Sequence, residues 1–313
     1  MDATLASIVA AASPLVYAAV GETIAEKAGV INLSLDGSIM LSAMAGFATA
    51  YTTGSVLLGF LVAAVVSMAV ALLIAFASIE LRLNQIAVGF VLTLLCADLS
   101  SFLGDPYVGQ RAPGVPSLPI PWLEDIPFLG TVLFKHNLSV YGSFLAIALG
   151  YWFIFRTRRG LELQGLGERP EAAHARGIRV NLWRYIYTVT GGALCGIAGA
   201  AFSLHVRLGW REGLTQNYGW IALAIVIFGG WHPVRAATGA YLFGALSVLA
   251  LKLQPHLPGL SQILPMTPFV LMILALLLVS QDWSQRLADR LPRWRRLLSG
   301  DPPSAIGVAF WRE

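Results

Sequence analysis

Hydrophobic residues along this chain gather in long runs, separated by shorter stretches rich in polar residues, glycine or proline. A helix needs roughly 20 apolar residues to cross a hydrocarbon core of about 30 Å. Runs near that length lie at about 3–21, 36–53, 55–79, 85–103, 138–155, 184–205, 216–231, 236–252 and 266–281. The pattern predicts an all-α polytopic integral membrane protein with about nine transmembrane helices, in a single domain over residues 1–313.

Composition leads to the same class of protein. Of the 313 residues, 57% are hydrophobic and only 12% are charged, whereas an ordinary soluble domain has about 25% charged residues. So few charges cannot cover the surface of a soluble enzyme. Cys96 and Cys195 both lie in apolar runs and are predicted to be packing residues. The basic residues form no stripe interleaved with aromatics, so nucleic acid is not an expected partner.

Arginine and lysine predict how the chain crosses the bilayer. Most of the 21 basic residues fall on one side of a nine-span topology, chiefly in the segments 156–184 and 283–313. The positive-inside rule therefore places both segments in the cytoplasm, with the N-terminus outside and the C-terminus inside. The connection 104–137 is rich in proline and is predicted to be an ordered external loop.

A weak internal sequence similarity relates two of the predicted spans. The segment Gly37–Ala43 resembles Gly219–Ile225, and the predicted topology makes these two spans run in opposite directions. That is the arrangement of an inverted repeat, which many transporters build around a central pathway. Chance similarity between apolar sequences explains this resemblance equally well.

The stretch 21–38 is too polar for lipid and too apolar for an ordinary loop. Irregular backbone of this kind is tolerated near membrane depth where it is buried in protein or lines an aqueous path. Its polar residues include Glu22, and Asn32, Ser34 and Asp36 alternate, so an extended segment would present these three together. One interpretation is a broken helix that lines a translocation path or braces its gate; the other is a cytoplasmic hairpin with solvated charges.

Asn84 and Gln85 begin the run at 85–103 and offer a second set of polar groups. They are candidates for the same path, or for a helix cap and a bond between helices. Asp98 lies inside the run, where an ionisable group is costly. Glu22, Asp36 and Asp98 are alternative candidates for a proton site, which keeps a proton-coupled secondary carrier open as an alternative function.

The segment 170–177 carries a complete signature of a short helix. Pro170 suits the first helical position, Glu171 complements the positive end of the helix dipole, and Gly177 can adopt the left-handed closing conformation. A two-turn helix of this kind suits docking into another protein, or simply closes a loop. No histidine spacing typical of a metal site, no phosphate-binding loop and no nucleophile with its base is present, so neither catalytic nor metal-binding residues are predicted.

Five segments in chain order resemble the permease subunits of bacterial ABC importers in the branched-chain amino acid and simple sugar permease superfamily. The likeness is greatest to the nucleoside-type permeases. The segments are Gly21–Gly37, Asn84–Gly89, Gly167–Ile178, Phe228–Pro233 and Pro303–Phe310. In this chain, Ser34 and Asp36 stand where the family has Gly and Glu. Gln164 and Gly165 replace an Arg-Ala pair before the coupling motif, so an ion pair with the ATPase is absent there or supplied from elsewhere.

The resemblance implies a fold like that of type II ABC importers, in a bacterial inner membrane, and a subunit that is not an enzyme. The helix at 170–176 would be the coupling helix, which docks in a groove of a separate cytoplasmic ATPase that holds ATP and magnesium. Coupling residues would be Gly167, Glu168, Pro170, Glu171, Ala173 and Gly177. Further implied partners are an extracytoplasmic substrate-binding protein and a second, related permease in a heterodimer. The cargo would be a nucleoside; a simple sugar, or a branched-chain amino acid, is the alternative.

Overall fold

The computed structural model describes residues 2–256, 266, 269–270, 273–274 and 301–311, and this part of the chain is helical, without a β-strand. The α-helices are α1 (Asp2–Lys27), α2 (Leu35–Thr53), α3 (Val56–Ile79), α4 (Gln85–Gly104), α5 (Leu138–Arg156), α6 (Arg158–Glu168), α7 (Pro170–Ala175), α8 (Val180–Ala201), α9 (Tyr218–Phe228) and α10 (Pro233–Leu253). Short 3-10 or π-helical segments are η1 (Asp105–Tyr107), η2 (Gly130–Phe134), η3 (Phe202–Val206) and η4 (Gln254–His256).

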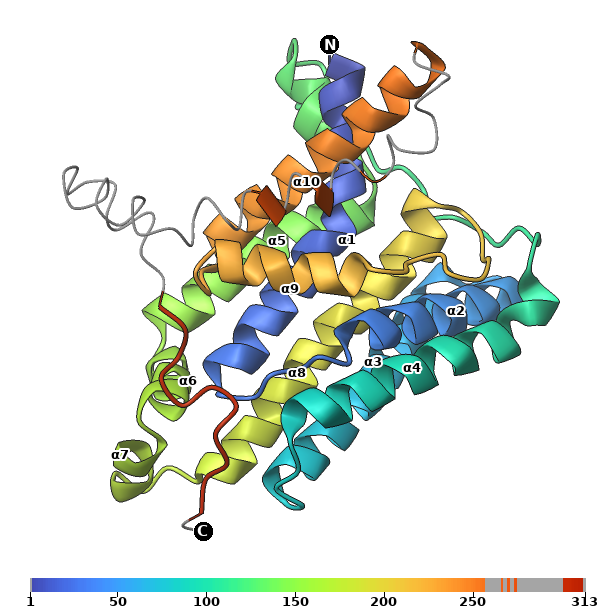
Figure 1. The fold of residues 1–313 in the computed structure, drawn as a ribbon. Coiled ribbons are helices and arrows are strands. Elements are labelled where there is room, and N and C mark those ends of the chain that lie inside the picture. Colours follow the sequence, from blue (N-terminus) through green and yellow to red (C-terminus); the bar gives the residue numbers. More distant parts are fainter. Residues whose placement is uncertain (1, 257–265, 267–268, 271–272, 275–300, 312–313) are drawn as a thin grey trace.

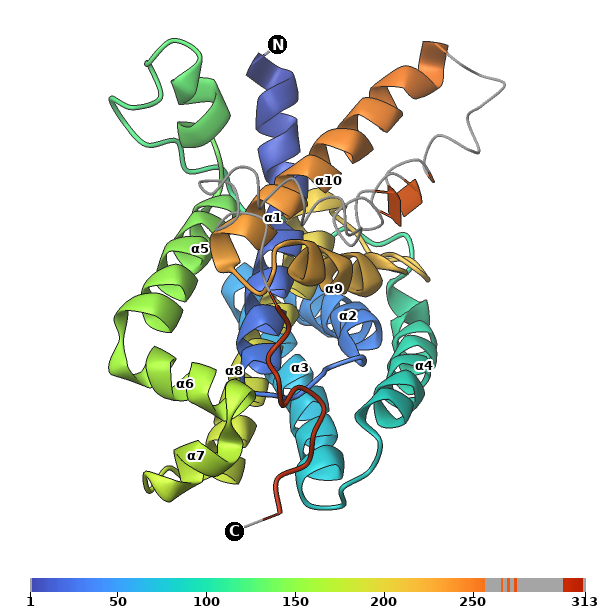
Figure 2. The same cartoon turned by 60° about the vertical axis from the view of Figure 1, so that its left-hand side comes forward.

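Helices α1 and α8 run through the middle of the bundle. Helices α2, α3 and α4 lie on one side of this pair, and α5, α9 and α10 lie on the other (Figures 1 and 2). The beginning of α1 lies at the upper end of the molecule in Figure 1. Helices α6 and α7 lie toward the lower end, and the segment 301–311 runs there from α6 toward the turn between α3 and α4.

Glycines let the central helices approach until their backbones touch. A Cβ on Gly21 of α1 would lie 2.5 Å from the carbonyl oxygen of Gly191 on α8, and a Cβ on Gly191 would lie 2.5 Å from the carbonyl oxygen of Gly21. On the other face of α8, a Cβ on Gly196 would lie 2.3 Å from the carbonyl oxygen of Ala63. The glycines of α8 therefore let the helix pack closely against α1 on one face and against α3 on the other.

Six helices in the described residues are long and apolar enough to cross a membrane: Asp2–Lys27, Val56–Ile79, Gln85–Tyr107, Leu138–Arg156, Val180–Val206 and Pro233–His256. The predicted run 36–53 forms α2, which is not among them. The run 216–231 forms α9, an apolar helix of 11 residues that is too short to span alone. Most of the run 266–281 lies outside the described residues, so the predicted count of nine is not confirmed.

The connection 104–137 is ordered by local structure instead of crossing the bundle. It contains η1 and η2, and an antiparallel bridge joins Ser117 to Asn137. The loop extends to the end of the molecule opposite α6 and α7 (Figure 1). Trp122 in this loop is 90% exposed. Cys96 and Cys195 are both buried free thiols, as predicted for packing residues.

Candidate functional site

Helix α1 continues past the predicted run and ends at Lys27, so two acidic residues lie in its last turns. Glu22 is 0% exposed and Glu26 is 3% exposed. Glu22 Oε1 accepts a hydrogen bond from the backbone N–H of Asn32 at 3.2 Å, and Glu26 Oε2 accepts one from Trp231 Nε1. The alternative of a hairpin with solvated charges is therefore wrong, because both carboxylates are inside the protein.

Residues 28–34 form the non-helical break between α1 and α2. Asn32 and Ser34 are buried there, and Ser34 donates to Asn32 Oδ1 from its backbone N–H at 3.2 Å and from its hydroxyl at 2.5 Å. The expectation that Asp36 lies beside them is wrong. Helix α2 begins at Leu35, which ends the two-residue alternation and turns Asp36 toward α9.

The carboxylate of Asp36 caps the beginning of α9. Its Oδ1 accepts the backbone N–H of Gly219 at 2.8 Å, and its Oδ2 accepts that of Asn217 at 3.2 Å. The first N–H groups of a helix have no partner within the helix and carry a partial positive charge, so a carboxylate is well suited to this position. Trp231, just after α9, donates to Glu26. Helix α9 is thus held at both ends by acidic residues from either side of the break.

Asn84 is the N-cap of α4, as one of the two sequence interpretations predicts. Its Oδ1 accepts from the backbone N–H groups of Ile86 at 2.9 Å and Ala87 at 3.2 Å. Gln85 Oε1 accepts from the backbone N–H of Ile31 at 2.8 Å and joins α4 to the break between α1 and α2. Helix α4 is therefore fixed to the same irregular segment that Glu22 supports.

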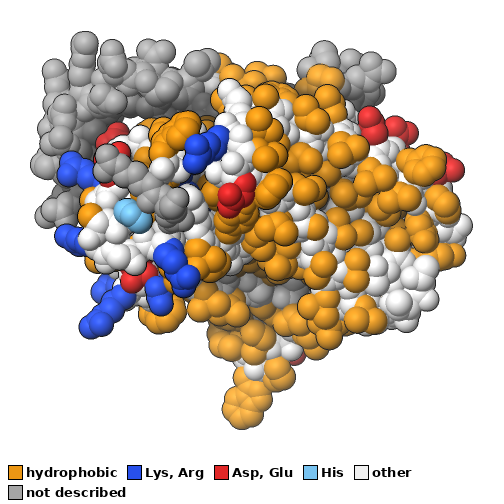
Figure 3. Space-filling view, turned by 90° about the horizontal axis from the view of Figure 1, so that it is seen from below, with side chains coloured by type: hydrophobic (Ala, Val, Ile, Leu, Met, Phe, Trp, Pro, Cys, Tyr) orange, Lys and Arg blue, Asp and Glu red, His pale blue; other side chains and the backbone are white. Residues whose placement is uncertain are grey.

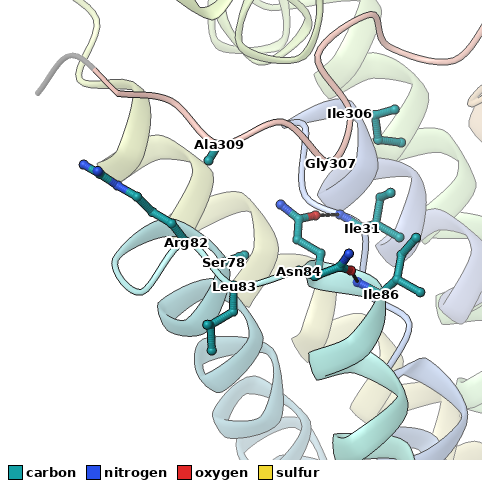
Figure 4. Close-up of a pocket in the computed structure, with 10 residues that line it drawn as sticks. Ile31, Ser78, Arg82, Leu83, Asn84, Ile86, Ile306, Gly307 and Ala309 are labelled. Atoms are coloured by element: carbon teal, nitrogen blue, oxygen red, sulfur yellow. Dashed lines mark hydrogen bonds between the residues drawn. The ribbon is translucent and has the colours of Figure 1, made fainter.

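A pocket of about 460 Å³ lies at the end of the molecule that is lower in Figure 1, and Figure 4 shows its lining residues. Its walls come from the break, from the turn between α3 and α4, and from the C-terminal segment. The lining residues are Ile31, Ser78, Arg82, Leu83, Asn84, Gln85, Ile86, Ile306, Gly307 and Ala309. Asn84 and Gln85 face this pocket. Glu22, Asn32, Ser34 and Asp36 are buried and are not among its lining residues.

The segment 156–184 contains two helices where the sequence predicts one. Helix α6 was not anticipated, and α7 coincides with the predicted short helix. Pro170 occupies its first turn, Glu171 follows it, and Gly177 adopts a left-handed φ of +82° just beyond its end. The short-helix signature is confirmed in each of these features.

The coupling residues predicted in this segment divide into an anchored group and an exposed group. Gly167 packs so close to α1 that a Cβ would lie 2.3 Å from the carbonyl oxygen of Lys27, and Ala173 is buried. Glu168 accepts a hydrogen bond from the Ser304 hydroxyl at 2.8 Å. Glu171 and Gly177 are exposed. Basic side chains gather on one part of this end of the molecule beside a mostly hydrophobic surface (Figure 3), and the exposed arginines of this segment are Arg156, Arg158, Arg159, Arg169, Arg176 and Arg179.

The sequence does not indicate the burial or the partners of several residues that organise the site. Arg184 looks like one more topology-setting charge, yet its side chain is 1% exposed. Glu26 and Trp231 belong to two of the recognised segments, but nothing local indicates that they bond to each other. In the described residues, no three His, Cys, Asp or Glu side chains gather as a metal site would require.

These features are those of a multi-pass membrane protein: apolar helices long enough to cross a membrane, a helix broken between α1 and α2, and a short surface helix at one end. The match to a family model is consistent with this class, because residues 4–279 match the model described as "Branched-chain amino acid transport system / permease component". The chain belongs to this family and is a multi-pass permease component of an ABC transporter.

Curated relatives carry two kinds of substrate name. The putative glucose ABC transporter permease protein TsgC13 of Haloferax volcanii is 39% identical, covering 80% of this chain and 77% of its own. The guanosine ABC transporter permease protein NupQ of Bacillus subtilis is 32% identical, covering 85% and 88%. The nucleoside ABC transporter permease protein NupC of Lactococcus lactis is 30% identical, covering 88% and 91%. No solved structure matches the chain.

Proposed function

We propose that this chain moves a nucleoside inward across the cell membrane by alternating access, driven by a separate ATPase subunit that binds the ATP and magnesium. Two relatives named for nucleoside or guanosine transport match along most of both chains, which supports the nucleoside. Nothing in the sequence suggests that this chain hydrolyses ATP itself. A substrate-binding protein outside the membrane would deliver the cargo.

Helix α7 is the proposed contact with the ATPase. The observation that carries this role is its position, with Ala173 packed against the bundle and the flanking residues Glu171, His174 and Arg176 exposed at the end of the molecule. Pro170 begins α7, and Gly167 sets the preceding helix α6 against α1. A movement of α7 would therefore reach α1 through α6, at the approach of Gly167 to Lys27.

The proposed translocation path includes the pocket beside Asn84 and Gln85, with Glu22, Asn32, Ser34 and Asp36 bracing its wall. An inverted repeat would relate α1 and α2 to α8 and α9. The reciprocal approach of Gly21 and Gly191 supports this relationship, as does the contact between the beginnings of α2 and α9. We place the N-terminus outside and the segments 156–184 and 283–313 in the cytoplasm; of the latter, the structure describes 301–311.

A heterodimer with a second permease is proposed for the full importer. Bacillus subtilis has proteins named as guanosine permeases NupQ and NupP, and Lactococcus lactis has nucleoside permeases NupC and NupB. This chain covers 88% of NupQ but only 38% of NupP, and 91% of NupC but only 30% of NupB. That difference supports a partner permease related to NupP and NupB, which this chain matches over the smaller part of their length.

A simple sugar is the second candidate cargo, because the relative at 39% identity is named for glucose. Uptake of labelled uridine, adenosine and glucose in cells with and without this gene separates the two, with ribose and leucine as competitors. Nucleoside uptake that depends on the gene and is not inhibited by excess glucose, ribose or leucine supports the proposal. Gene-dependent glucose uptake alone would replace the nucleoside by a sugar and keep the mechanism.

The energy source separates an ATP-driven importer from a proton-coupled carrier. Initial uptake is measured just after a protonophore collapses the proton gradient, in cells whose ATP is maintained. An ATP-driven importer continues under these conditions, and uptake should also require a separate ATPase subunit. Immediate loss of uptake would contradict the proposed mechanism and favour a carrier that uses buried acids such as Glu22.

A further inference from the structure

The C-terminal segment 301–311 crosses the lower end of the molecule and contacts elements that are far apart in the sequence (Figure 1). The backbone N–H of Ala305 donates to Gly167 O at 2.8 Å, and that of Gly307 donates to Gly29 O at 3.0 Å. Gly167 belongs to α6, just before the coupling helix α7, and Gly29 belongs to the break between α1 and α2. Ala305 and Gly307 are only two positions apart, so the segment bonds both to α6 and to the break between α1 and α2.

Arg184 lies beneath this segment, at the junction of α6, the break and the tail. Its guanidinium donates to Val308 O at 2.7 Å and to Leu166 O at 3.4 Å. Gly29 lies so close that a Cβ there would be 2.7 Å from an Arg184 nitrogen. A guanidinium presents several donors in one plane and is costly to bury unless carbonyls receive them. Arg184 is therefore placed to hold three separate backbone segments together.

Side chains on either side of residues 305–308 make further contacts with the rest of the protein. The Ser304 hydroxyl donates to Glu168, and the ring of buried Phe310 lies 5.4 Å from that of His174 on α7. Trp311 lies beneath the guanidinium of Arg82, 4.3 Å from its ring centre. Ile306, Gly307 and Ala309 also form one wall of the pocket in Figure 4. The segment touches the coupling helix at one edge and the pocket at the other.

We propose that residues 301–311 form a coupling strap, with Arg184 as its positioning residue, and that the strap carries movement of α6 and α7 to the break and the pocket wall. This role rests on the proposed function of α7. The direct Gly167–Lys27 contact and the burial of Leu163 and Leu166 still attach α6 when the strap is absent. Loss of the strap is therefore expected to weaken the link between ATP hydrolysis and transport, and to leave the bundle folded.

The experiment measures ATP hydrolysed and substrate transported in the same vesicles, which contain the complete importer with its ATPase and binding protein. The variants are a chain ending at Gly300, Arg184→Met and Arg184→Lys. Val308→Ala is the matched control, because its side chain is 53% exposed and only its carbonyl contacts Arg184. Assembly of each complex is checked by copurification of the ATPase.

We expect the truncated chain and Arg184→Met to bind the ATPase and hydrolyse ATP, with transport per ATP reduced at least about fivefold. Arg184→Lys keeps the charge but lacks the planar fork, so it should recover only part of the ratio. Val308→Ala should match the unaltered chain. A normal ratio in an assembled truncated complex would overturn the strap, and so would an equal loss in Val308→Ala.

Two further results keep the test decisive. If Arg184→Met fails to assemble, the truncated chain and the double variant Ser304→Ala, Phe310→Ala still decide, since they leave Arg184 in place. If these also fail to assemble, the segment serves folding and the strap is overturned. Absence of ATP-dependent transport in the unaltered complex would count against the proposed function. A normal transport rate that survives loss of the segment would count against the strap alone.

Discussion

Asp36 Oδ1 accepts the backbone N–H of Gly219 at 2.8 Å across 183 positions of the sequence. The two residues lie in the first turns of α2 and α9, so two helix beginnings meet at one carboxylate. A Cβ on Gly219 would lie 2.2 Å from Asp36 Cα, which leaves no room for any other residue at that position. The contact fixes how α9 starts and thereby how it lies against α2.

Replacing Asp36 by Leu should impair transport and leave the ATPase bound. The change removes the acceptor for two backbone N–H groups, and loss of a helix cap costs about 1–2 kcal/mol. Asp36→Asn keeps one acceptor oxygen and should show an intermediate loss. Transport and ATPase copurification are measured together; full activity of Asp36→Leu would contradict a role for the α2–α9 contact.

Trp231→Phe should lower the stability of the purified protein. The change leaves a smaller aromatic ring in place, and the buried Glu26 carboxylate loses its indole donor, at a cost of about 1–3 kcal/mol. The measurement is the thermal midpoint in detergent. Trp122→Phe is the matched control, because Trp122 is almost fully exposed. Equal midpoints for the two variants would show that the Glu26–Trp231 bond adds nothing to stability.

Gly177→Val should weaken binding of the ATPase. Its φ of +82° is left-handed, which costs most residues about 1–2 kcal/mol and a β-branched residue more. The surroundings are open, since nothing lies within 4 Å of a Cβ at this position, so backbone strain is the only expected cause.

Gly165 provides the control for this experiment. It also has open space around a Cβ, but it lies within helix α6 with ordinary helical backbone. Gly165→Ala should therefore bind the ATPase as the unaltered chain does, and Gly177→Ala should show a smaller defect than Gly177→Val. Normal assembly of Gly177→Val would remove Gly177 from the coupling residues.

Acid should destabilise the protein partly through His232, which lies between α9 and α10 with its ring stacked on Phe155 at 4.8 Å. Burial, followed by the positive charges of Arg235 and Lys27, lowers the pKa of His232 below its ordinary value of 6.5. Because the unfolded chain takes up the proton first, this contribution is complete above the ordinary pKa and is lost as the pH falls below it.

Thermal midpoints at about pH 7.5 and about pH 5.5 test the role of His232, since an imidazole with the ordinary pKa, as in the unfolded chain, changes charge between these values. The fall in midpoint should be smaller for His232→Phe than for the unaltered protein. His256→Phe removes an exposed histidine and should behave as the unaltered protein does. An unchanged fall in His232→Phe would assign the acid sensitivity to other groups.

The sequence predicts those elements whose ends are determined by neighbouring residues. Pro170 and Gly177 bound a short helix whose ends are specified within eight residues, and Asn84 caps α4 through N–H groups two and three positions away. The partners of Asp36 and Glu26 lie about 180 to 205 positions away, so no local pattern could indicate them. Arg184 was missed because a buried arginine and a solvated one look alike in a basic segment.

Helix α6 shows a different limit. Its charged beginning and its glycines resemble a loop, and the helix gains its stability from Leu163 and Leu166, which are buried against the bundle. Tertiary packing thus overrides a weak local preference. The irregular break at 28–34 was anticipated, but the change from turn to helix at Leu35 decided which neighbours Asp36 could reach.

The reciprocal contact of Gly21 and Gly191 has a mechanical consequence. Two helices whose backbones already touch can approach no further at that point, which leaves tilting, sliding or separation as the possible relative movements. If α1 and α8 stay in contact there and tilt against each other, their lower parts separate only as their upper parts draw together. A bulkier residue at Gly191 would force the two backbones apart and remove this point of contact.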